Sequence, residues 1–87
     1  MARQVGAVIY TQPHCAPCKQ VEQFLEEHAV PFVTRDVTKD PVALNELVER
    51  GFMATPVTNI GEQWIAGFQR DELRDAIAAT QSEVSHG

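Results

Sequence analysis

Residues 7–18, AVIYTQPHCAPC, decide how this chain folds and where its chemistry lies. The stretch opens with four consecutive apolar residues, 7–10, which predict a central strand covered on both faces. A polar loop over 11–14 follows, and Cys15-Ala16-Pro17-Cys18 then leads into a helical pattern that runs to about His28. A Cys-x-x-Cys pair between a buried strand and a helix is therefore the feature around which the chain is organised.

The two cysteines are predicted to play different roles. Cys15 precedes the helix, where unpaired backbone N–H groups and the helix dipole stabilise an anion and lower the pKa of a thiol. Cys18 shares a helical face with Val21 and Leu25, so we expect it to be partly buried. We predict that Cys15 is an exposed thiolate that attacks a disulfide, and that Cys18 resolves the mixed disulfide with a high effective concentration.

A Cys-x-x-Cys can also form half of a zinc site, but structural zinc takes four ligands. This chain has two cysteines, and its three histidines, His14, His28 and His86, show no zinc-finger spacing. We therefore predict no bound metal and no bound cofactor. A module that holds a metal or an iron–sulfur cluster stays as the less favoured alternative, beside a pair of unreactive core cysteines.

The middle of the chain predicts a second strand over 32–37 and a helix that starts at Asp40, with Pro41 at its first position. Gly51 supplies a stop for that helix. The stripe expected to be buried on it consists of Val42, Leu44, Leu47 and Val48.

Two short strands, 57–60 and 63–66, are separated by a tight turn and predict a hairpin. A last helix begins near Arg70 and turns Leu73, Ala76 and Ile77 inward. Residues 80–87 are polar and patternless, so we expect a flexible tail after one domain of residues 1–79.

The composition of the chain limits the kinds of partner that the protein can bind. With 87 residues the chain forms a single domain, and its net charge of −5 without a Lys/Arg run argues against a nucleic-acid partner. The apolar stretch near the start is too short for an export signal or a membrane span. We expect a cytoplasmic monomer, and in a reducing cytosol a cysteine pair is more often catalytic than structural.

The element order β-α-β-α-β-β-α, with a four-stranded mixed sheet flanked by three helices, resembles the thioredoxin fold in its glutaredoxin-like form. Thr55-Pro56-Val57 resembles the loop that carries a cis-proline facing the active site in this family, and it follows a Gly51-Phe52 pair. Residues 64–68, WIAGF, resemble the Trp-Ser-Gly-Phe stretch of the NrdH-redoxins. The resemblance covers residues 5–79.

This resemblance implies an electron carrier with a redox-active disulfide centre that serves cell redox homeostasis. NrdH-redoxins take electrons from NADPH through thioredoxin reductase and reduce a ribonucleotide reductase. Glutaredoxins instead use glutathione, and they tend to place a lysine where this chain has Gln12. The bulky Phe68 would crowd the glutathione groove. The chain therefore favours a protein reductase as donor, with a glutathione-dependent glutaredoxin as the alternative.

Residues expected to bind the substrate come from the same resemblance. Thr55 and Pro56 would present a backbone edge to the substrate chain, and Trp64 would border the active site rather than only cover the core. The full set is Gln12, Thr55, Pro56, Trp64, Gly67, Phe68 and Asp71.

Overall fold

The computed structural model describes the backbone of residues 6–86 and the side chains of residues 6–80. Its elements follow the predicted order: β1 (Ala7–Thr11), α1 (Ala16–Glu27), β2 (Phe32–Asp36), α2 (Pro41–Glu49), β3 (Val57–Ile60), β4 (Gln63–Ala66) and α3 (Arg70–His86). Strand boundaries differ from the predicted ones by at most one residue.

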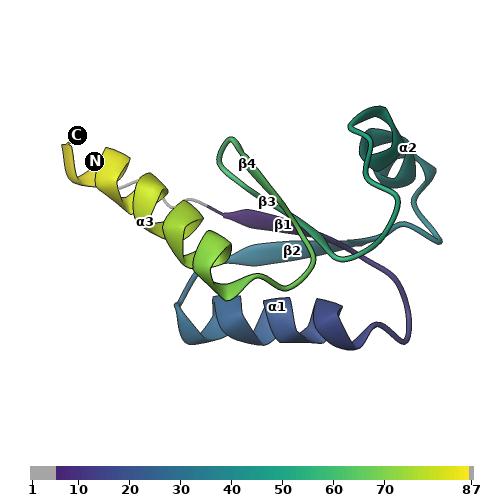
Figure 1. Cartoon of the computed structure of the whole chain (residues 1–87), viewed down its shortest axis with the longest axis horizontal. Helices are drawn as coiled ribbons and strands as arrows, with labels where there is room; N and C mark the ends of the chain where they lie inside the picture. The colour runs from purple at the N-terminus through teal and green to yellow at the C-terminus, as the bar shows by residue number, and fades with distance from the viewer. Residues whose placement is uncertain (1–5, 87) are drawn as a thin grey trace.

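The sheet has four strands in the order β2-β1-β3-β4, so the strand that precedes Cys15 is central. β1 pairs in parallel with β2 and antiparallel with β3, and β3 and β4 form the predicted hairpin. Helices α1 and α3 lie on one face of this sheet and α2 lies on the other (Figure 1). The mixed sheet and its three helices are a thioredoxin-like fold.

Two clusters of buried side chains fill the space between these layers, because alternate residues of each strand point to opposite faces. The cluster under α1 and α3 contains Ile9, Val21, Leu25, Ile60, Ile65, Leu73, Ala76 and Ile77, among others. The cluster under α2 contains Tyr10, Ala43, Leu47 and Val57. The inward positions predicted for α3 are therefore confirmed.

Helix α2 has a narrower buried face than the sequence predicted. Asp40 caps its first turn as expected, with Oδ1 accepting from the Ala43 N–H at 3.1 Å. Gly51 follows its end at φ +84°, which suits glycine. Only Ala43 and Leu47, four residues apart, are buried on it. Val42, Leu44 and Val48 are exposed, so their assignment to the core was wrong. Positions 42 and 44 flank 43 by about 100° each and cannot face the same narrow contact.

The predicted tail is helical in the structure, since α3 continues to His86. Its side chains after Thr80, and Gly87 itself, lie outside the described residues, so the division of the chain at residue 79 stays a prediction. Within residues 6–86, none of the helices has the length and apolar character needed to span a bilayer.

Candidate functional site

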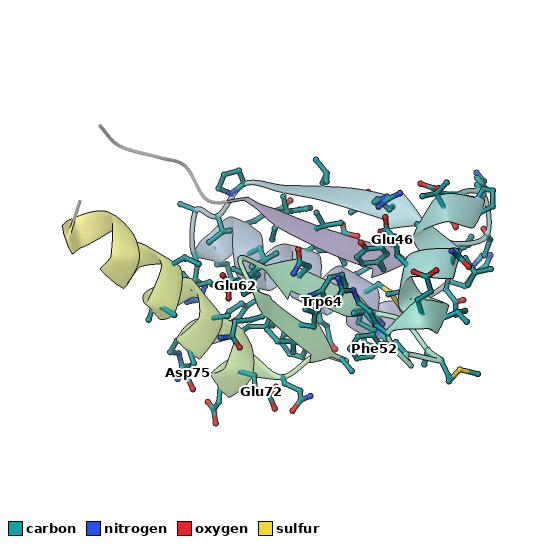
Figure 2. All side chains as sticks on the ribbon, turned by 90° about the horizontal axis from the view of Figure 1, so that it is seen from above. Glu46, Phe52, Glu62, Trp64, Glu72 and Asp75 are labelled. Carbon is teal, nitrogen blue, oxygen red and sulfur yellow. A yellow bond between two sulfur atoms is a disulfide. The ribbon has the colours of Figure 1, made fainter. Side chains whose placement is uncertain are left out.

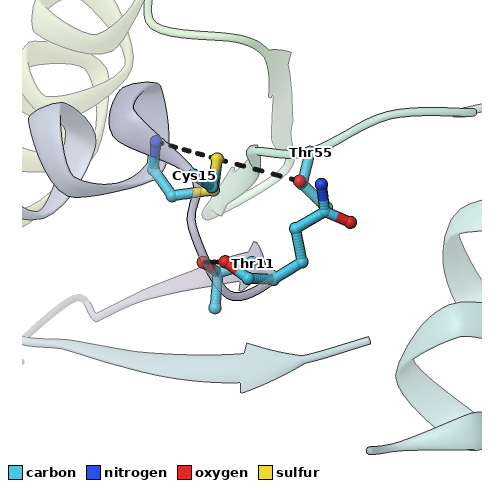
Figure 3. The surroundings of a disulfide bond; sticks show 5 residues. Thr11, Cys15 and Thr55 are labelled. Atoms are coloured by element: carbon cyan, nitrogen blue, oxygen red, sulfur yellow. Dashed lines mark hydrogen bonds between the residues drawn. A yellow bond between two sulfur atoms is a disulfide. The ribbon is translucent and has the colours of Figure 1, made fainter. Parts of the chain in front are cut away.

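Cys15 and Cys18 form a disulfide at the N-terminus of α1, with their Cα atoms 5.3 Å apart (Figure 3). Cys15 is the N-cap of the helix, and its Sγ accepts a hydrogen bond from the Cys18 N–H at 3.2 Å. This donor is one of the N–H groups that the helix itself cannot pair. The same N–H group and the helix dipole favour a thiolate on Cys15 once the disulfide opens.

The two sulfurs differ in accessibility less than the sequence suggested. Cys15 is 9% exposed and Cys18 is 1% exposed. Cys18 is thus sheltered as a resolving thiol should be. The expectation of an exposed Cys15 was wrong for the disulfide form, because a loop carrying Thr55 lies beside it and contacts its sulfur.

That loop carries a cis peptide bond between Thr55 and Pro56, at the position the family resemblance indicated. The Thr55 hydroxyl lies 3.9 Å from the Cys15 Sγ (Figure 3). The Pro56 carbonyl accepts from the Gly67 N–H at 2.8 Å. Gly67 has φ +77°, a conformation that glycine adopts without strain. Tertiary packing therefore joins the cysteines, the proline loop and the segment before α3.

A groove of about 330 Å³ opens next to Gln12 and Thr55. Its walls are otherwise mostly apolar and come from the residue after β2, from α2 and from the α2–β3 loop: Val37, Leu44, Leu47, Val48, Phe52, Met53 and Ala54. Met53 is 89% exposed and Val48 is 54% exposed. None of the lining residues carries a charge. The apolar groove was missed at the sequence level, where Leu44 and Val48 had been assigned to the core.

Trp64 does not line this groove but contacts Phe52, which does. Its ring packs on Phe52 at a centroid distance of 6.2 Å and on Tyr10 at 5.7 Å. The Arg50 guanidinium carbon lies 4.1 Å from the Trp64 ring centroid, a cation–π contact that the sequence did not predict. Figure 2 shows Trp64 and Phe52 beside α2. Trp64 is half-buried, and Phe52 connects it to the groove.

A charged network fixes α2 against the sheet on the same side. The Tyr10 hydroxyl donates to Glu46 at 2.7 Å, and Arg35 pairs with Glu46 at 2.8 Å and with Asp40 at 3.2 Å. Burial and then the Glu46 hydrogen bond raise the pKa of Tyr10. The Ala43 N–H, and after it Arg35, lowers the pKa of Asp40.

Phe68 and Asp71 lie elsewhere. Phe68 packs edge-on against Phe24 of α1 at 6.2 Å and adjoins the cluster under α1 and α3. Asp71 is paired with Arg74 on α3 at 3.5 Å. Neither residue lines the groove beside Cys15. Their assignment to substrate binding stays a prediction. Among the side chains of residues 6–80, no three His, Cys, Asp or Glu residues are grouped so that they could hold a metal ion.

Comparison with known proteins agrees with this geometry. The glutaredoxin family model matches residues 7–65. The glutaredoxin-like protein NrdH of Lactococcus lactis is 31% identical over 65 residues, which cover 75% of this chain and 90% of that protein.

Two solved structures share the fold. The thioredoxin-like protein BC3987 is 37% identical with a TM-score of 0.75, covering 80% of this chain and 97% of the other. NrdH-redoxin from Escherichia coli is 28% identical with a TM-score of 0.75, covering 79% and 91%.

A thioredoxin-like fold with a Cys-x-x-Cys pair at the start of α1 defines a dithiol–disulfide oxidoreductase. Since the family model spans most of the domain, the chain belongs to the glutaredoxin family. Within that family it is similar to the NrdH proteins.

Proposed function

We propose that this protein is an NrdH-like electron carrier that receives electrons from thioredoxin reductase and reduces disulfides of protein partners. The observation that carries the proposal is the uncharged, mostly apolar groove lined by Thr55, the residue that contacts the Cys15 sulfur. A glutathione carboxylate gains little from such walls, whereas the apolar side chains of a protein lose water when they are buried there. Gln12, which lines the groove, offers an amide where a cation would suit a carboxylate.

The cysteine positions support a two-step exchange. The Cys15 thiolate attacks one sulfur of the substrate disulfide, forms a mixed disulfide and releases the other substrate sulfur as a thiolate. Cys18 then loses its proton and attacks Cys15 Sγ, which re-forms the disulfide described above and releases the second substrate thiolate. The substrate sulfurs take up two protons in total, and two electrons from NADPH, delivered by the reductase, return the pair to the dithiol.

The proline loop supports recognition of a peptide chain. Thr55 contacts the Cys15 sulfur, and Pro56 follows it in the cis form. We assign the Thr55–Pro56 backbone the role of an edge with which an extended substrate segment pairs. Gln12 would act at the groove and Trp64 through its contact with Phe52, whereas Gly67, Phe68 and Asp71 would act in the segment before α3 and in its first turn.

Ribonucleotide reductase is one candidate partner, because the family resemblance implies it. We place the protein in the cytoplasm as a monomer, where the apolar groove is free to receive a partner.

The donor is tested by following NADPH consumption with insulin as the disulfide substrate. One arm supplies a bacterial thioredoxin reductase, and the other supplies glutathione with glutathione reductase. Turnover in the first arm, at a rate at least tenfold above the second, supports the proposal. Turnover with glutathione alone would overturn it and make this protein a glutathione-dependent glutaredoxin.

A further inference from the structure

The side-chain hydroxyl of Thr58, in β3, is buried and has no hydrogen-bond partner within the described part of the chain. The residue is 0% exposed, and among the described side chains its Oγ1 is the buried polar atom that lacks a hydrogen-bond partner. Proteins pair the great majority of such atoms, so an idle buried hydroxyl calls for an explanation. It lies in a strand whose other buried side chains, Val57 and Ile60, are apolar.

The strand register places the Thr58 side chain on the face of the sheet that α1 and α3 cover. Thr58 pairs with Ile9 of β1 and with Ile65 of β4, and both isoleucines belong to the cluster under α1 and α3. Val57, the residue before it, faces the opposite cluster under α2. Thr58 is therefore the first residue of β3 that faces the helix layer of α1 and α3.

Cys18 lies on the face of α1 that covers this side of the sheet. It shares the buried face of α1 with Val21 and Leu25, which belong to that cluster. The N-terminal end of β3 lies near the cysteines, since Thr55, three residues before Thr58, contacts the Cys15 sulfur. A fully buried sulfur and a fully buried, unpaired hydroxyl thus lie at the same end of one sheet face.

We propose that Thr58 is a positioning residue for Cys18, whose hydroxyl becomes the hydrogen-bond partner of the Cys18 sulfur when the disulfide opens, directly or through one buried water. The proposal rests on the resolving role of Cys18 in the function proposed above. In the disulfide, Cys18 Sγ is bonded to Cys15 and bears no charge, so the hydroxyl stays idle. Before the resolving attack, Cys18 must lose its proton at 1% exposure, where solvent gives the thiolate little stabilisation.

The donated hydrogen bond stabilises the Cys18 thiolate without adding a second buried charge. The proton that leaves Cys18 passes to the departing substrate thiolate, and the Thr58 hydroxyl keeps its own proton throughout. Thr58 accordingly acts on the Cys18 sulfur only as a hydrogen-bond donor, and its loss slows resolution without blocking the first attack by Cys15.

The change in stability of the oxidised and dithiol forms on substitution of Thr58 distinguishes this hydrogen-bonding role from a packing role. Thr58→Val keeps the shape of the side chain and removes the hydroxyl. The oxidised protein then loses an unpaired polar group and becomes more stable, whereas the dithiol protein loses a hydrogen bond and becomes less stable. A packing role would change the stability of both forms in the same direction.

The test equilibrates wild type, Thr58→Val and Thr58→Ser with mixtures of reduced and oxidised dithiothreitol, and counts free thiols by alkylation and mass spectrometry. We expect Thr58→Val to shift the equilibrium about tenfold towards the disulfide, or roughly 30 mV for this two-electron couple. Thr58→Ser, which keeps the hydroxyl, should stay within twofold of wild type. Equal constants for all three proteins, or a Thr58→Ser shift equal to that of Thr58→Val, would overturn the proposal.

A second measurement addresses Cys18 directly. In the Cys15→Ser background, the pH dependence of Cys18 alkylation should move to higher pH when Thr58 is replaced by valine, and an unchanged profile contradicts the proposal. Both experiments use only small-molecule reagents. Their results therefore do not depend on whether thioredoxin reductase or glutathione is the electron donor.

Discussion

The hydroxyl of Thr55 lies 3.9 Å from the sulfur of Cys15, across 40 positions of the chain. This contact joins the proline loop to the helix that carries the dithiol, and it restricts access to Cys15 to a small exposed edge. A substrate disulfide must approach past this loop. We therefore propose that the loop and the groove lined by Thr55 select the partner.

The first prediction concerns the two sulfurs. Cys15→Ser should abolish reduction of protein disulfides, because Cys18 at 1% exposure cannot reach a substrate. Cys18→Ser should still attack and then stay linked to the substrate as a mixed disulfide. Non-reducing gels and mass spectrometry of the trapped adduct check both outcomes. Full turnover by Cys15→Ser would sink the assignment of the attacker.

The second prediction concerns the groove. Val48→Asp places a charge on its apolar wall. We expect the KM of thioredoxin reductase for this protein to rise about tenfold, because burying an apolar side chain such as valine is worth about 1.5 kcal/mol. Val42→Asp is the matched control, because Val42 is 61% exposed on the same helix and does not line the groove. Reduction by dithiothreitol should be the same in both variants. Equal KM values for the two variants would show that the reductase does not use the groove.

The third prediction concerns the contact of Arg50 with Trp64. Arg50→Ala should lower the free energy of unfolding by about 0.5–1 kcal/mol, as expected for a cation–π pair at a partly exposed site. Urea denaturation followed by the fluorescence of Trp64 measures it. Arg74→Ala is the control, because that side chain is 58% exposed and forms only a surface pair with Asp71. A loss as large in the control would assign the effect to charge rather than to the ring contact.

The fourth prediction concerns acid stability. Asp40 has a lowered pKa in the folded protein, first because the Ala43 N–H bonds to it. The unfolded chain therefore binds a proton at Asp40 more readily than the folded protein does. The ionised Asp40 carboxylate stabilises the fold at pH values above its ordinary pKa of 3.8, and this stabilisation is lost as the pH falls through the folded pKa. Asp40→Asn keeps an N-cap and removes the titration. Its stability should fall less steeply than that of wild type below pH 3.8. Parallel acid-unfolding curves for the two proteins contradict this.

The fifth prediction concerns the buried end of the charged network. Tyr10→Phe removes the hydroxyl that donates to Glu46 at 2.7 Å and leaves Glu46 with Arg35. We expect a loss of about 1.5 kcal/mol in the free energy of unfolding, since the acceptor is charged. Thermal unfolding of the oxidised protein measures it, and an unchanged midpoint would show that the bond contributes nothing net.

Local sequence determined much of this protein. Short-range signals, namely apolar runs, a cap residue, glycine and proline, predict strand β1, the cap at Asp40, the break at Gly51 and the hairpin of β3 and β4. The redox pair was identified in the same way, because the chemistry of a Cys-x-x-Cys pair at a helix start depends on four consecutive residues. These features need no knowledge of what packs against them.

Only the tertiary structure decided which side chains of α2 are buried and what lies beside the sulfurs. Apolar residues at 42, 44 and 48 predict burial, yet α2 packs on a narrow face at Ala43 and Leu47, and Leu44 and Val48 line a groove instead. The contacts of Thr55 with Cys15 and of Arg50 with Trp64, and the idle hydroxyl of Thr58, depend on register and on helix placement. Such contacts join residues far apart in the chain, and no local pattern records them, because strand pairing and layer packing fix them only when the whole domain has folded.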